Sequence, residues 1–421
     1  MSTGAPPPAA AEAEDASRAA PLRNPAFRGL MAYRLCTILS YQIVAVTVGW
    51  HVYELTRNPW MLGLIGLAEV LPYFCVAPFA GYLVDHLPRR RVGTVACLGL
   101  AVTPLLLAAI TLGAIGGGVI AIYLSIVLTG MVRSFLGPVY NALFARVLPR
   151  AQFARGASLG SIVFQTGLVV GPAVGGVVVG WGGKAWAYGL AAVFAACAAV
   201  AVARLRVSEP APQLQRAPIF ASITEGARFV FGHQVLLAAL ALDMFAVLFG
   251  GAISLAPAFI HDILERGPEA LGILRGAPAL GAVAVGVWLA RHPIQRNAGR
   301  IMLAAVAGFG LCIIGFGLST AFWLSAAFLL LSGMCDGVSV VLRSTVLQLA
   351  TPDGMRGRVS SINGLFVGSS NELGAFYAGS MARLLGLVPA VVLGGCVTIG
   401  VVLTTAWRAP RLRRLDLREL Q

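Results

Sequence analysis

The 421-residue sequence has few charged residues and a single lysine, Lys184. Charged residues make up 11% of the chain and hydrophobic residues 58%. Soluble domains carry about 25% charged residues, so this chain has too few charged residues to cover the surface of a water-soluble domain of its length. The net charge of +14 comes mainly from arginines in short segments between apolar runs, which excludes a nucleic-acid-binding face. The composition predicts a protein whose main partner is a lipid bilayer, with no nucleic acid.

The motifs of enzymes and metalloproteins are also missing. Seven cysteines lie scattered, mostly in apolar runs, with no CxxC pair and no histidines at metal-ligand spacing, so we expect inert cysteines and no metal site. No glycine-rich stretch ends in Gly-Lys-Ser/Thr, which excludes a P-loop and makes ATP hydrolysis by this chain unexpected. No nucleophile or carboxylate pair forms a catalytic constellation, so the sequence predicts neither an enzyme nor a cofactor.

Long apolar runs are what the sequence has in abundance. Twelve of them reach the roughly 20 residues that a helix needs to cross the ~30 Å hydrocarbon core. Only helices satisfy their own backbone in lipid at this length, so the predicted fold class is all-α. The approximate limits of the spans are 29–53, 61–83, 92–112, 119–143, 157–180, 185–205, 235–259, 270–290, 300–318, 322–345, 360–383 and 387–406.

The arginines orient the predicted bundle. If the N-terminus is cytoplasmic, the arginine-rich segments fall in cytoplasmic loops and tails, and the outer loops hold only Arg57, Lys184 and Arg266. Basic residues accumulate on the cytoplasmic side of membranes, so both termini are predicted to be cytoplasmic. The first residues carry Glu12, Glu14 and Asp15 where a signal peptide has a basic region, which favours a disordered cytoplasmic tail.

The chain also repeats itself. A shift of 203 residues places a series of identical residues on one another, including Gly176 on Gly379, and a shift of 209 places Gly63 on Gly272. Two pseudo-symmetric bundles of six helices are therefore predicted. The predicted boundaries are a disordered tail at 1–26, the first bundle at 27–205, a cytoplasmic linker at 206–232, the second bundle at 233–407 and a basic cytoplasmic tail at 408–421.

Ionisable residues inside the apolar spans are costly and usually face a cavity or a partner. The repeat places Arg34 on Asp243 and Arg133 on Asp336, so one half is basic where the other is acidic. Counted from the nearer loop at ~1.5 Å per residue, all four lie in the cytoplasmic half, roughly 10–15 Å deep. We expect them to pair between the halves when the cytoplasmic side is shut. The alternative is that each snorkels or bonds a neighbouring carbonyl.

The segment between the second and third spans combines a glycine, a carboxylate and three arginines: Gly81, Asp85, Arg89, Arg90 and Arg91. This pattern resembles the signature of the major facilitator superfamily of secondary transporters, and the resemblance runs from about Phe27 to Arg408. His86 and Pro88 depart from the usual pattern. The resemblance implies that Asp85 braces the N-terminus of the eleventh span, where a carboxylate meets a positive helix end. We interpret the segment as a gating latch.

The fifth span contains a series of closely spaced small residues: Gly167, Gly171, Pro172, Gly175 and Gly176. The series resembles the motif of exporters in the same superfamily, although Ser158 stands where an earlier glycine is expected. The resemblance favours export over import. Small residues four apart also let helices approach closely, so ordinary tight packing is the alternative. Finer similarity, as in Phe27-Arg28, points to the drug and siderophore efflux branch that includes the enterobactin exporter.

The resemblance implies a cavity lined by the first, fourth, seventh and tenth spans. Candidate residues for substrate binding or proton coupling are Arg34, Gln42, Glu69, Arg133, Asp243, Asp336, Arg343 and Glu372. Without ATP the remaining energy source is an ion gradient, and an approaching arginine can eject a proton from a buried carboxylate. Asp336 is the first candidate because Arg343 shares its helix face, whereas Glu69 is alternatively a helix-kink partner beside Pro72.

The predicted function is proton-coupled export of small amphipathic molecules, drug-like compounds or siderophores, by alternating access. The expected location is a bacterial inner membrane, and the chain is expected to act as a monomer. Two alternatives remain, an importer on the same fold and a non-transporting membrane receptor or assembly factor. Arginines and aromatic edges suit an anionic or catechol-bearing amphiphile, and mixed charges also suit polyspecific drugs.

Overall fold

The computed structural model describes residues 21–149, 152–207, 219–292, 294–352 and 355–420. These residues form helices joined by short connections, and no strand occurs among them. The first half of the bundle contains α2 (Pro25–Thr56), α3 (Pro59–His86), α4 (Arg89–Thr111), α5 (Gly118–Val147), α6 (Phe153–Gly182) and α7 (Lys184–Ala203). The second half contains α9 (Gln234–Phe249), α10 (Ala256–Asp262), α11 (Glu269–Arg291), α12 (Ala298–Leu318), α13 (Phe322–Ala350), α14 (Arg356–Leu385) and α15 (Leu387–Arg408).

Eleven segments in the described residues are long and apolar enough to cross a membrane, which confirms a multi-pass all-α membrane protein. The eleventh predicted span, 360–383, corresponds to α14, which is not among the eleven segments of this length and hydropathy. Its polar residues, including Asn371, Glu372 and Arg383, lower its hydropathy. At 30 residues α14 is nevertheless as long as the apolar helices α5 and α6.

The two opening helices begin at the same local signal, an asparagine followed by a proline. Asn24 precedes Pro25, and its side-chain oxygen accepts a hydrogen bond of 2.9 Å from the Ala26 amide. Asn58 precedes Pro59 in the same way at the start of α3. Asparagine satisfies an otherwise unpaired amide at a helix start, and proline is pre-shaped for the first helical position. The sequence therefore sets these two helix starts locally.

The seventh predicted span, 235–259, is not one continuous helix. Helix α9 ends at Phe249, a 3₁₀ turn follows at Ala252–Leu255, and α10 continues to Asp262. The break falls at Gly250 and Gly251, where a Cβ on Gly251 would lie 3.0 Å from the Gly374 backbone of α14. Because α14 packs closely against this point, the chain breaks here and does not continue as the regular helix that the apolar run predicted.

The sequence repeat reappears in the helix boundaries. Adding 203 to the bounds of α5 gives 321–350, against Phe322–Ala350 for α13. Adding 203 to the bounds of α6 gives 356–385, which are the bounds of α14. Adding 209 to the bounds of α4 gives 298–320, against Ala298–Leu318 for α12. The two halves therefore share one helical plan.

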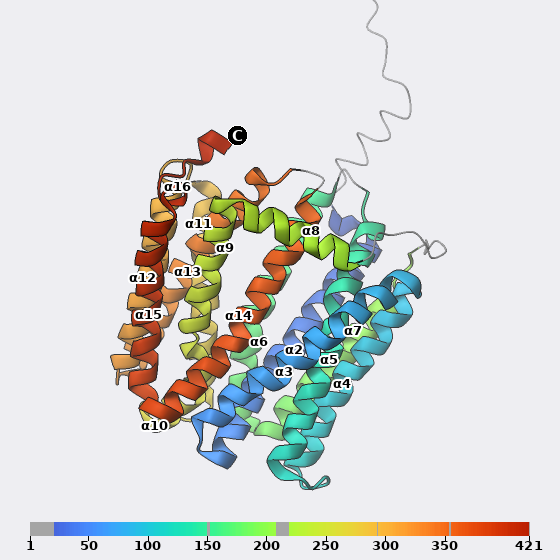
Figure 1. The fold of residues 1–421 in the computed structure, drawn as a ribbon. Helices are drawn as coiled ribbons and strands as arrows, with labels where there is room; N and C mark the ends of the chain where they lie inside the picture. The colour runs from blue at the N-terminus through green and yellow to red at the C-terminus, as the bar shows by residue number, and fades with distance from the viewer. Residues whose placement is uncertain (1–20, 150–151, 208–218, 293, 353–354, 421) are drawn as a thin grey trace, which may run out of the picture.

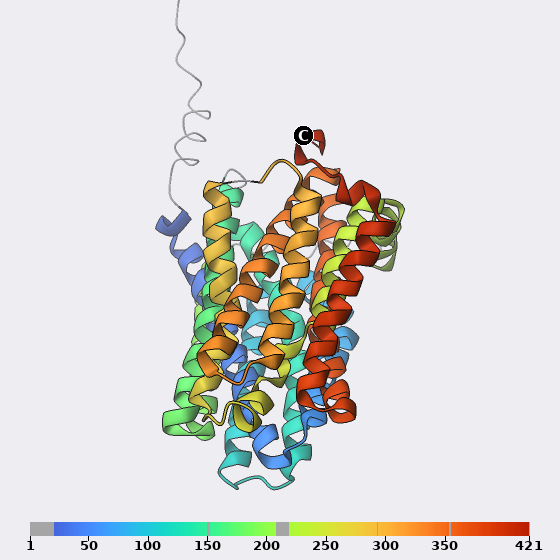
Figure 2. The same ribbon diagram turned by 90° about the vertical axis from the view of Figure 1, so that its left-hand side faces the viewer.

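The helices run roughly along one axis, with the C-terminus and the first described residues at the same end (Figures 1 and 2). We name this the terminal end and the opposite one the far end. The two halves meet along two helix pairs, α3 with α14 and α6 with α11. Helix α8 (Ile219–Gly232) lies across the bundle towards the terminal end (Figure 1), within the predicted linker 206–232. The candidate site lies between these two seams.

Candidate functional site

Arg34 lies inside the first half and contacts aromatic rings. Its guanidinium carbon is 3.9 Å from the ring centre of Tyr140 on α5 and 5.3 Å from that of Phe164 on α6. Such cation–π contacts stabilise a cation in an apolar environment. Its Nε atom is buried and, within the described part of the chain, has no hydrogen-bond partner. Arg34 therefore retains an unused donor.

Arg133 and Glu69 form an ion pair between α5 and α3 of the first half. The Arg133 guanidinium also lies 4.4 Å from the ring centre of Tyr41 on α2. Gly130, one turn before Arg133, has no Cβ, which lets α5 approach the Glu69 backbone closely. The sequence also allows Glu69 to be a structural partner for the helix kink at Pro72. In the structure the Glu69 carboxylate binds Arg133.

Asp243 and Arg343 form a second ion pair, between α9 and α13 of the second half. Their side chains are only 5% and 6% exposed. The sequence places Arg343 on the same helix face as Asp336, but in the structure Arg343 pairs with Asp243. Subtracting the repeat offsets, 343 − 203 and 243 − 209, leads to Tyr140 and Arg34. The Asp243–Arg343 ion pair of the second half thus lies at the positions that correspond, under the repeat, to the contact between Arg34 and Tyr140 in the first half.

The helix bounds give the distance of each of these four charged residues from the end of its helix at the terminal end, and their depth in the bilayer stays a prediction. Arg34 and Asp243 each lie nine residues from a helix start (34 − 25 and 243 − 234), or ~14 Å. Arg133 and Asp336 each lie 14 residues from a helix end (147 − 133 and 350 − 336), or ~21 Å. Helices α5 and α13 extend beyond the predicted limits 143 and 345. Arg133 and Asp336 therefore lie near the middle of α5 and α13, a position along the helices that we call mid-depth.

Asp336 has no ion-pair partner within the described ranges. Its counterpart Arg133 has two neighbours, Glu69 and Tyr41, and the repeat offset of 209 leads from these to Pro278 and Gly250. Neither proline nor glycine offers a polar side chain. The second half therefore has a carboxylate, Asp336, at the position of Arg133, but no polar side chains at the positions of Glu69 and Tyr41.

The predicted pairing between halves is not present in this conformation. Arg133 binds Glu69 and Asp243 binds Arg343, each within its own half. Cross-half pairs of Arg34 with Asp243 and of Arg133 with Asp336 stay a prediction for a state with the cytoplasmic side shut.

Sequence analysis missed one residue, Arg275 on α11. Its charge and that of Arg133 act on Glu372 of α14 only at longer range, because neither arginine forms an ion pair with Glu372 among the described residues. Tyr41 interacts with both Arg133 and Glu372. We call Tyr41, Glu69, Arg133, Arg275 and Glu372 the central cluster. A charge inside the predicted span 270–290 was the signal that could have found Arg275.

Gln42 and most of the small-residue series of α6 serve packing within the first half. Cβ atoms on Gly167 and Gly171 would meet Ile38 and Gln42 of α2, the second at 2.6 Å, and one on Gly175 would lie 3.2 Å from the Ile43 Cα. These contacts fit the packing alternative. Pro172 lies inside α6 without ending it.

Gly176, the last residue of that series, packs against the other half. A Cβ there would lie 2.6 Å from the Cα of Gly272 on α11. The repeat leads from these two glycines to Gly379 and Gly63, and a Cβ on Gly379 would lie 2.7 Å from the Gly63 Cα. The two seams between the halves thus contain two symmetric glycine crossings, formed by residues that the sequence repeat had aligned.

We expect Gly272→Ala to destabilise this conformation by about 1–3 kcal/mol, the usual cost of overpacking. The added Cβ would lie 2.8 Å from the carbonyl oxygen of Ala173, a backbone atom that cannot rotate away. Thermal unfolding of the purified protein measures the effect. Gly286→Ala is the matched control on the same helix, because no atom lies within 4 Å of its Cβ position. Equal midpoints for the two variants would contradict the tight crossing.

The gating segment is described only in part. Arg90 donates a hydrogen bond to the carbonyl of Ala203 at the end of α7, so it caps a helix of its own half. Gly81 has open space around its Cβ position, and Arg89 and Arg91 lie in the first turn of α4. The side chain of Asp85 lies outside the described residues. The brace between Asp85 and the start of α14 therefore stays a prediction.

Cross-half polar contacts gather at the far end. The Tyr53 hydroxyl donates a hydrogen bond to the Asp262 carboxylate, and Arg57 contacts the His261 ring. His261 lies 2.7 Å from Asp262. Together with the glycine crossings these contacts join the two halves at the far end.

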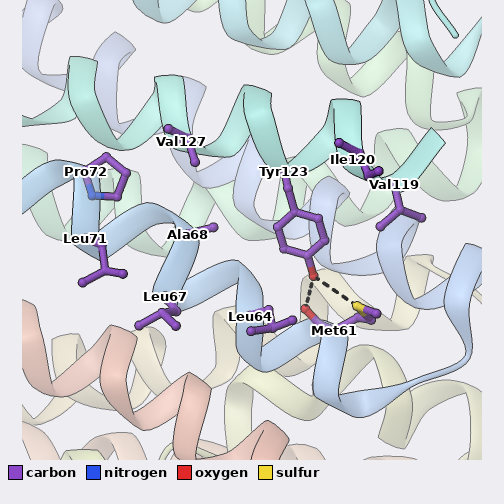
Figure 3. A pocket seen from close by; sticks show the side chains of 10 residues that line it. All are labelled: Met61, Leu64, Leu67, Ala68, Leu71, Pro72, Val119, Ile120, Tyr123 and Val127. Atoms are coloured by element: carbon purple, nitrogen blue, oxygen red, sulfur yellow. Dashed lines mark hydrogen bonds between the residues drawn. The ribbon is translucent and has the colours of Figure 1, made fainter. Parts of the chain in front are cut away.

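A groove of about 460 Å³ lies between α3 and α5 (Figure 3). Its one hydroxyl belongs to Tyr123, which donates a hydrogen bond of 2.5 Å to the Met61 carbonyl. Leu71 and Ile120 on its rim are exposed, as expected for a face in contact with lipid. None of its lining residues is charged, so it is separate from the central cluster. Its lining comprises Met61, Leu64, Leu67, Ala68, Leu71, Pro72, Val119, Ile120, Tyr123 and Val127.

Comparison with known proteins adds the family context. The sequence pattern of the family described as transmembrane secretion effector, within the major facilitator superfamily, matches residues 16–421. The chain is 28% identical over 392 residues to the enterobactin exporter EntS of Shigella boydii serotype 18, covering 90% of this chain and 91% of that protein.

Solved structures show the same fold. A bacterial homologue of the human lysosomal transporter Spinster, in an inward-facing and unoccupied conformation, superposes with a TM-score of 0.72. It shares 13% identity and covers 92% of this chain and 95% of its own. A D-xylose-proton symporter gives a TM-score of 0.72 at 11% identity, covering 93% of this chain and 99% of its own.

Proposed function

Because the chain belongs to the transmembrane secretion effector family of the major facilitator superfamily, we propose that it exports small amphipathic molecules, siderophores or drug-like compounds, by alternating access. The observation that carries the proposal is the set of charges within the spans of both halves, of which Arg133 and Glu69 form an ion pair in the first half and Asp243 and Arg343 in the second. Intramembrane charges that face one another across a repeat fit a site that opens to one side at a time. The exporter relative supports the direction of transport.

We place both termini on the cytoplasmic side of a bacterial inner membrane. The arginine-rich connections fall on that side, and the relative that matches 90% of this chain is named as a bacterial enterobactin exporter. In this orientation the far end, where the polar contacts and glycine crossings join the halves, faces outward, and we propose that the conformation is inward-facing. Substrate would enter from the cytoplasm at the terminal end and bind at the central cluster.

We propose a proton gradient as the energy source, with Asp336 as the proton-carrying group. Its carboxylate has no ion-pair partner among the described residues and lies near mid-depth. A carboxylate inside a membrane span that gains and loses polar neighbours between two conformations can bind a proton in one of them and release it in the other. No further cofactor is required, and a single chain contains every residue of this scheme.

Transport by purified protein in proteoliposomes tests the function. A catechol-bearing anion and a hydrophobic drug cation are offered separately with a pH step across the membrane. We expect substrate to accumulate against the direction of proton flow. Accumulation along the direction of proton flow would identify an importer, and no transport of either class, with or without the pH step, would favour a receptor.

A further inference from the structure

The tail after α15, residues 409–418, packs onto the terminal end of the second half (Figure 1). Leu412, Leu415 and Leu417 are at most 6% exposed, and they lie in one apolar cluster with residues of α9, α12 and α13. The tail and the start of α12 approach closely, because the Leu412 carbonyl lies where a Cβ on Gly299 would be. The tail is therefore a fixed part of the terminal end.

Two backbone hydrogen bonds join the tail to the connection between α11 and α12. The Leu417 amide donates to the Gln295 carbonyl at 3.0 Å, and the Gly299 amide donates to the Leu415 carbonyl at 3.3 Å. An arginine stands next to each of these four residues in the chain, so the two bonds bring arginines from distant parts of the sequence close together. These arginines are Arg296 and Arg300 in the connection and Arg414 and Arg418 in the tail.

Residues 291–300 and 408–418 together present eight exposed arginines and a single carboxylate, Asp416. That carboxylate accepts a hydrogen bond of 3.1 Å from the Arg418 amide. Within the described part of the chain, none of the eight arginines forms an ion pair. Like charges held this close repel one another, so the buried leucines hold together a positive cluster that favours an anionic partner. We call the eight the arginine patch: Arg291, Arg296, Arg300, Arg408, Arg411, Arg413, Arg414 and Arg418.

The arginine patch lies where three membrane-spanning helices end. Helix α11 ends at Arg291, α12 begins at Ala298 and α15 ends at Arg408. Within the last turn of α15 and of α11, Trp407 and Trp288 are 76% and 55% exposed. Exposed tryptophans near the ends of spans are typical of the boundary between hydrocarbon and head groups. The patch is therefore at the level of the lipid phosphates.

We propose that the arginine patch binds anionic phospholipids through their phosphodiester groups. A guanidinium binds two phosphate oxygens at once, and basic clusters directly beside membrane spans attract anionic lipids. A head group bound between the tail and the α11–α12 connection supplies the negative charge that the patch lacks and holds the two segments together. The inference goes beyond the proposed export function and depends on neither the direction of transport nor its energy source.

Thermal unfolding of the purified protein in detergent micelles tests the site without any transport assay. Phosphatidylglycerol is titrated into the micelles, and zwitterionic phosphatidylcholine at the same lipid fraction is the reference. We expect the unfolding midpoint to rise with phosphatidylglycerol and not with phosphatidylcholine. Sodium phosphate, compared with sodium chloride of equal ionic strength, separates the lipid from a soluble anion. A rise with phosphate alone that equals the rise with phosphatidylglycerol would overturn the lipid as the ligand.

Replacing the four arginines beside the two backbone hydrogen bonds is expected to weaken phosphatidylglycerol binding at least about tenfold. Each arginine near an anionic surface contributes to binding, and a tenfold change requires little more than one such contribution. The control replaces four exposed arginines at the terminal end of the first half and should keep the wild-type affinity. The patch variant carries Arg296→Gln, Arg300→Gln, Arg414→Gln and Arg418→Gln, and the control carries Arg23→Gln, Arg28→Gln, Arg204→Gln and Arg206→Gln.

Leu417→Pro separates the arrangement of the patch from its charge. Proline lacks the amide that donates to Gln295, so the tail loosens while every arginine remains. We expect this variant also to bind phosphatidylglycerol more weakly, each protein being compared with its own midpoint without lipid. Equal losses in the patch variant and the control would reduce the effect to net charge and overturn the site. Wild-type affinity in Leu417→Pro would show that the tail and the connection do not form one site.

Discussion

Replacing Asp243 by alanine is expected to lower the free energy of unfolding by about 3–5 kcal/mol, the largest effect on stability of any substitution proposed for this protein. The variant leaves the Arg343 guanidinium, only 6% exposed, without its counter-charge. An uncompensated buried charge is far more costly than the loss of the pair as a whole. Unfolding of the purified protein in detergent, followed by denaturant titration or thermal melting, measures the change.

Two controls make this result specific. Glu54→Ala breaks a more exposed pair with Lys184, whose side chains are 45% and 21% exposed, and should cost no more than about 1 kcal/mol. Asp243→Leu combined with Arg343→Met removes both charges and should recover most of the stability lost in Asp243→Ala. A cost for Asp243→Ala that matches Glu54→Ala would show that water reaches the pair.

Asp336→Asn is expected to abolish accumulation driven by a pH gradient while sparing exchange of substrate without a gradient. The amide has nearly the shape of the carboxylate but cannot carry a proton. With one proton exchanged per substrate, a step of one pH unit supports about tenfold accumulation, because one unit corresponds to ~1.4 kcal/mol. Proteoliposome uptake with and without the pH step measures the accumulation, and counterflow measures exchange.

Glu265→Gln is the matched control for this experiment, because it neutralises an exposed carboxylate in a far-end connection. It should leave both accumulation and exchange unchanged. If Asp336→Asn accumulates substrate as the wild type does, another carboxylate carries the proton, and Glu372 is the next to test. Loss of exchange together with accumulation would instead assign Asp336 to substrate binding.

Most of the fold was predictable from local and periodic features of the sequence. Apolar runs of membrane-spanning length predicted the helices, and the repeat shifts predicted a second half whose boundaries follow the first. Departures occur where another helix intervenes. The seventh span breaks at Gly250 and Gly251 because α14 packs against that point, and α5 extends past residue 143 because hydropathy does not register the polar end of a helix.

The candidate site was predictable as a set of residues but not as an arrangement. Charges within apolar runs identified Arg133, Asp243, Asp336 and Glu372, because lipid makes any such charge exceptional. Their partners did not follow from the same rule. Arg133 binds a residue 64 positions earlier in the chain, and the choice between Glu69 and Asp336 depends on which helices are neighbours.

The sequence by itself determined that this protein lies in a membrane, that it is helical, that it is built from two related halves and that the charges of those halves are opposed. These properties follow from composition and periodicity, which act on each segment independently of its neighbours. Only the tertiary structure decided that the charges pair within each half and that four glycines form two crossings between the halves. Those outcomes depend on distances between helices, and helix packing sets such distances through contacts among residues far apart in the chain.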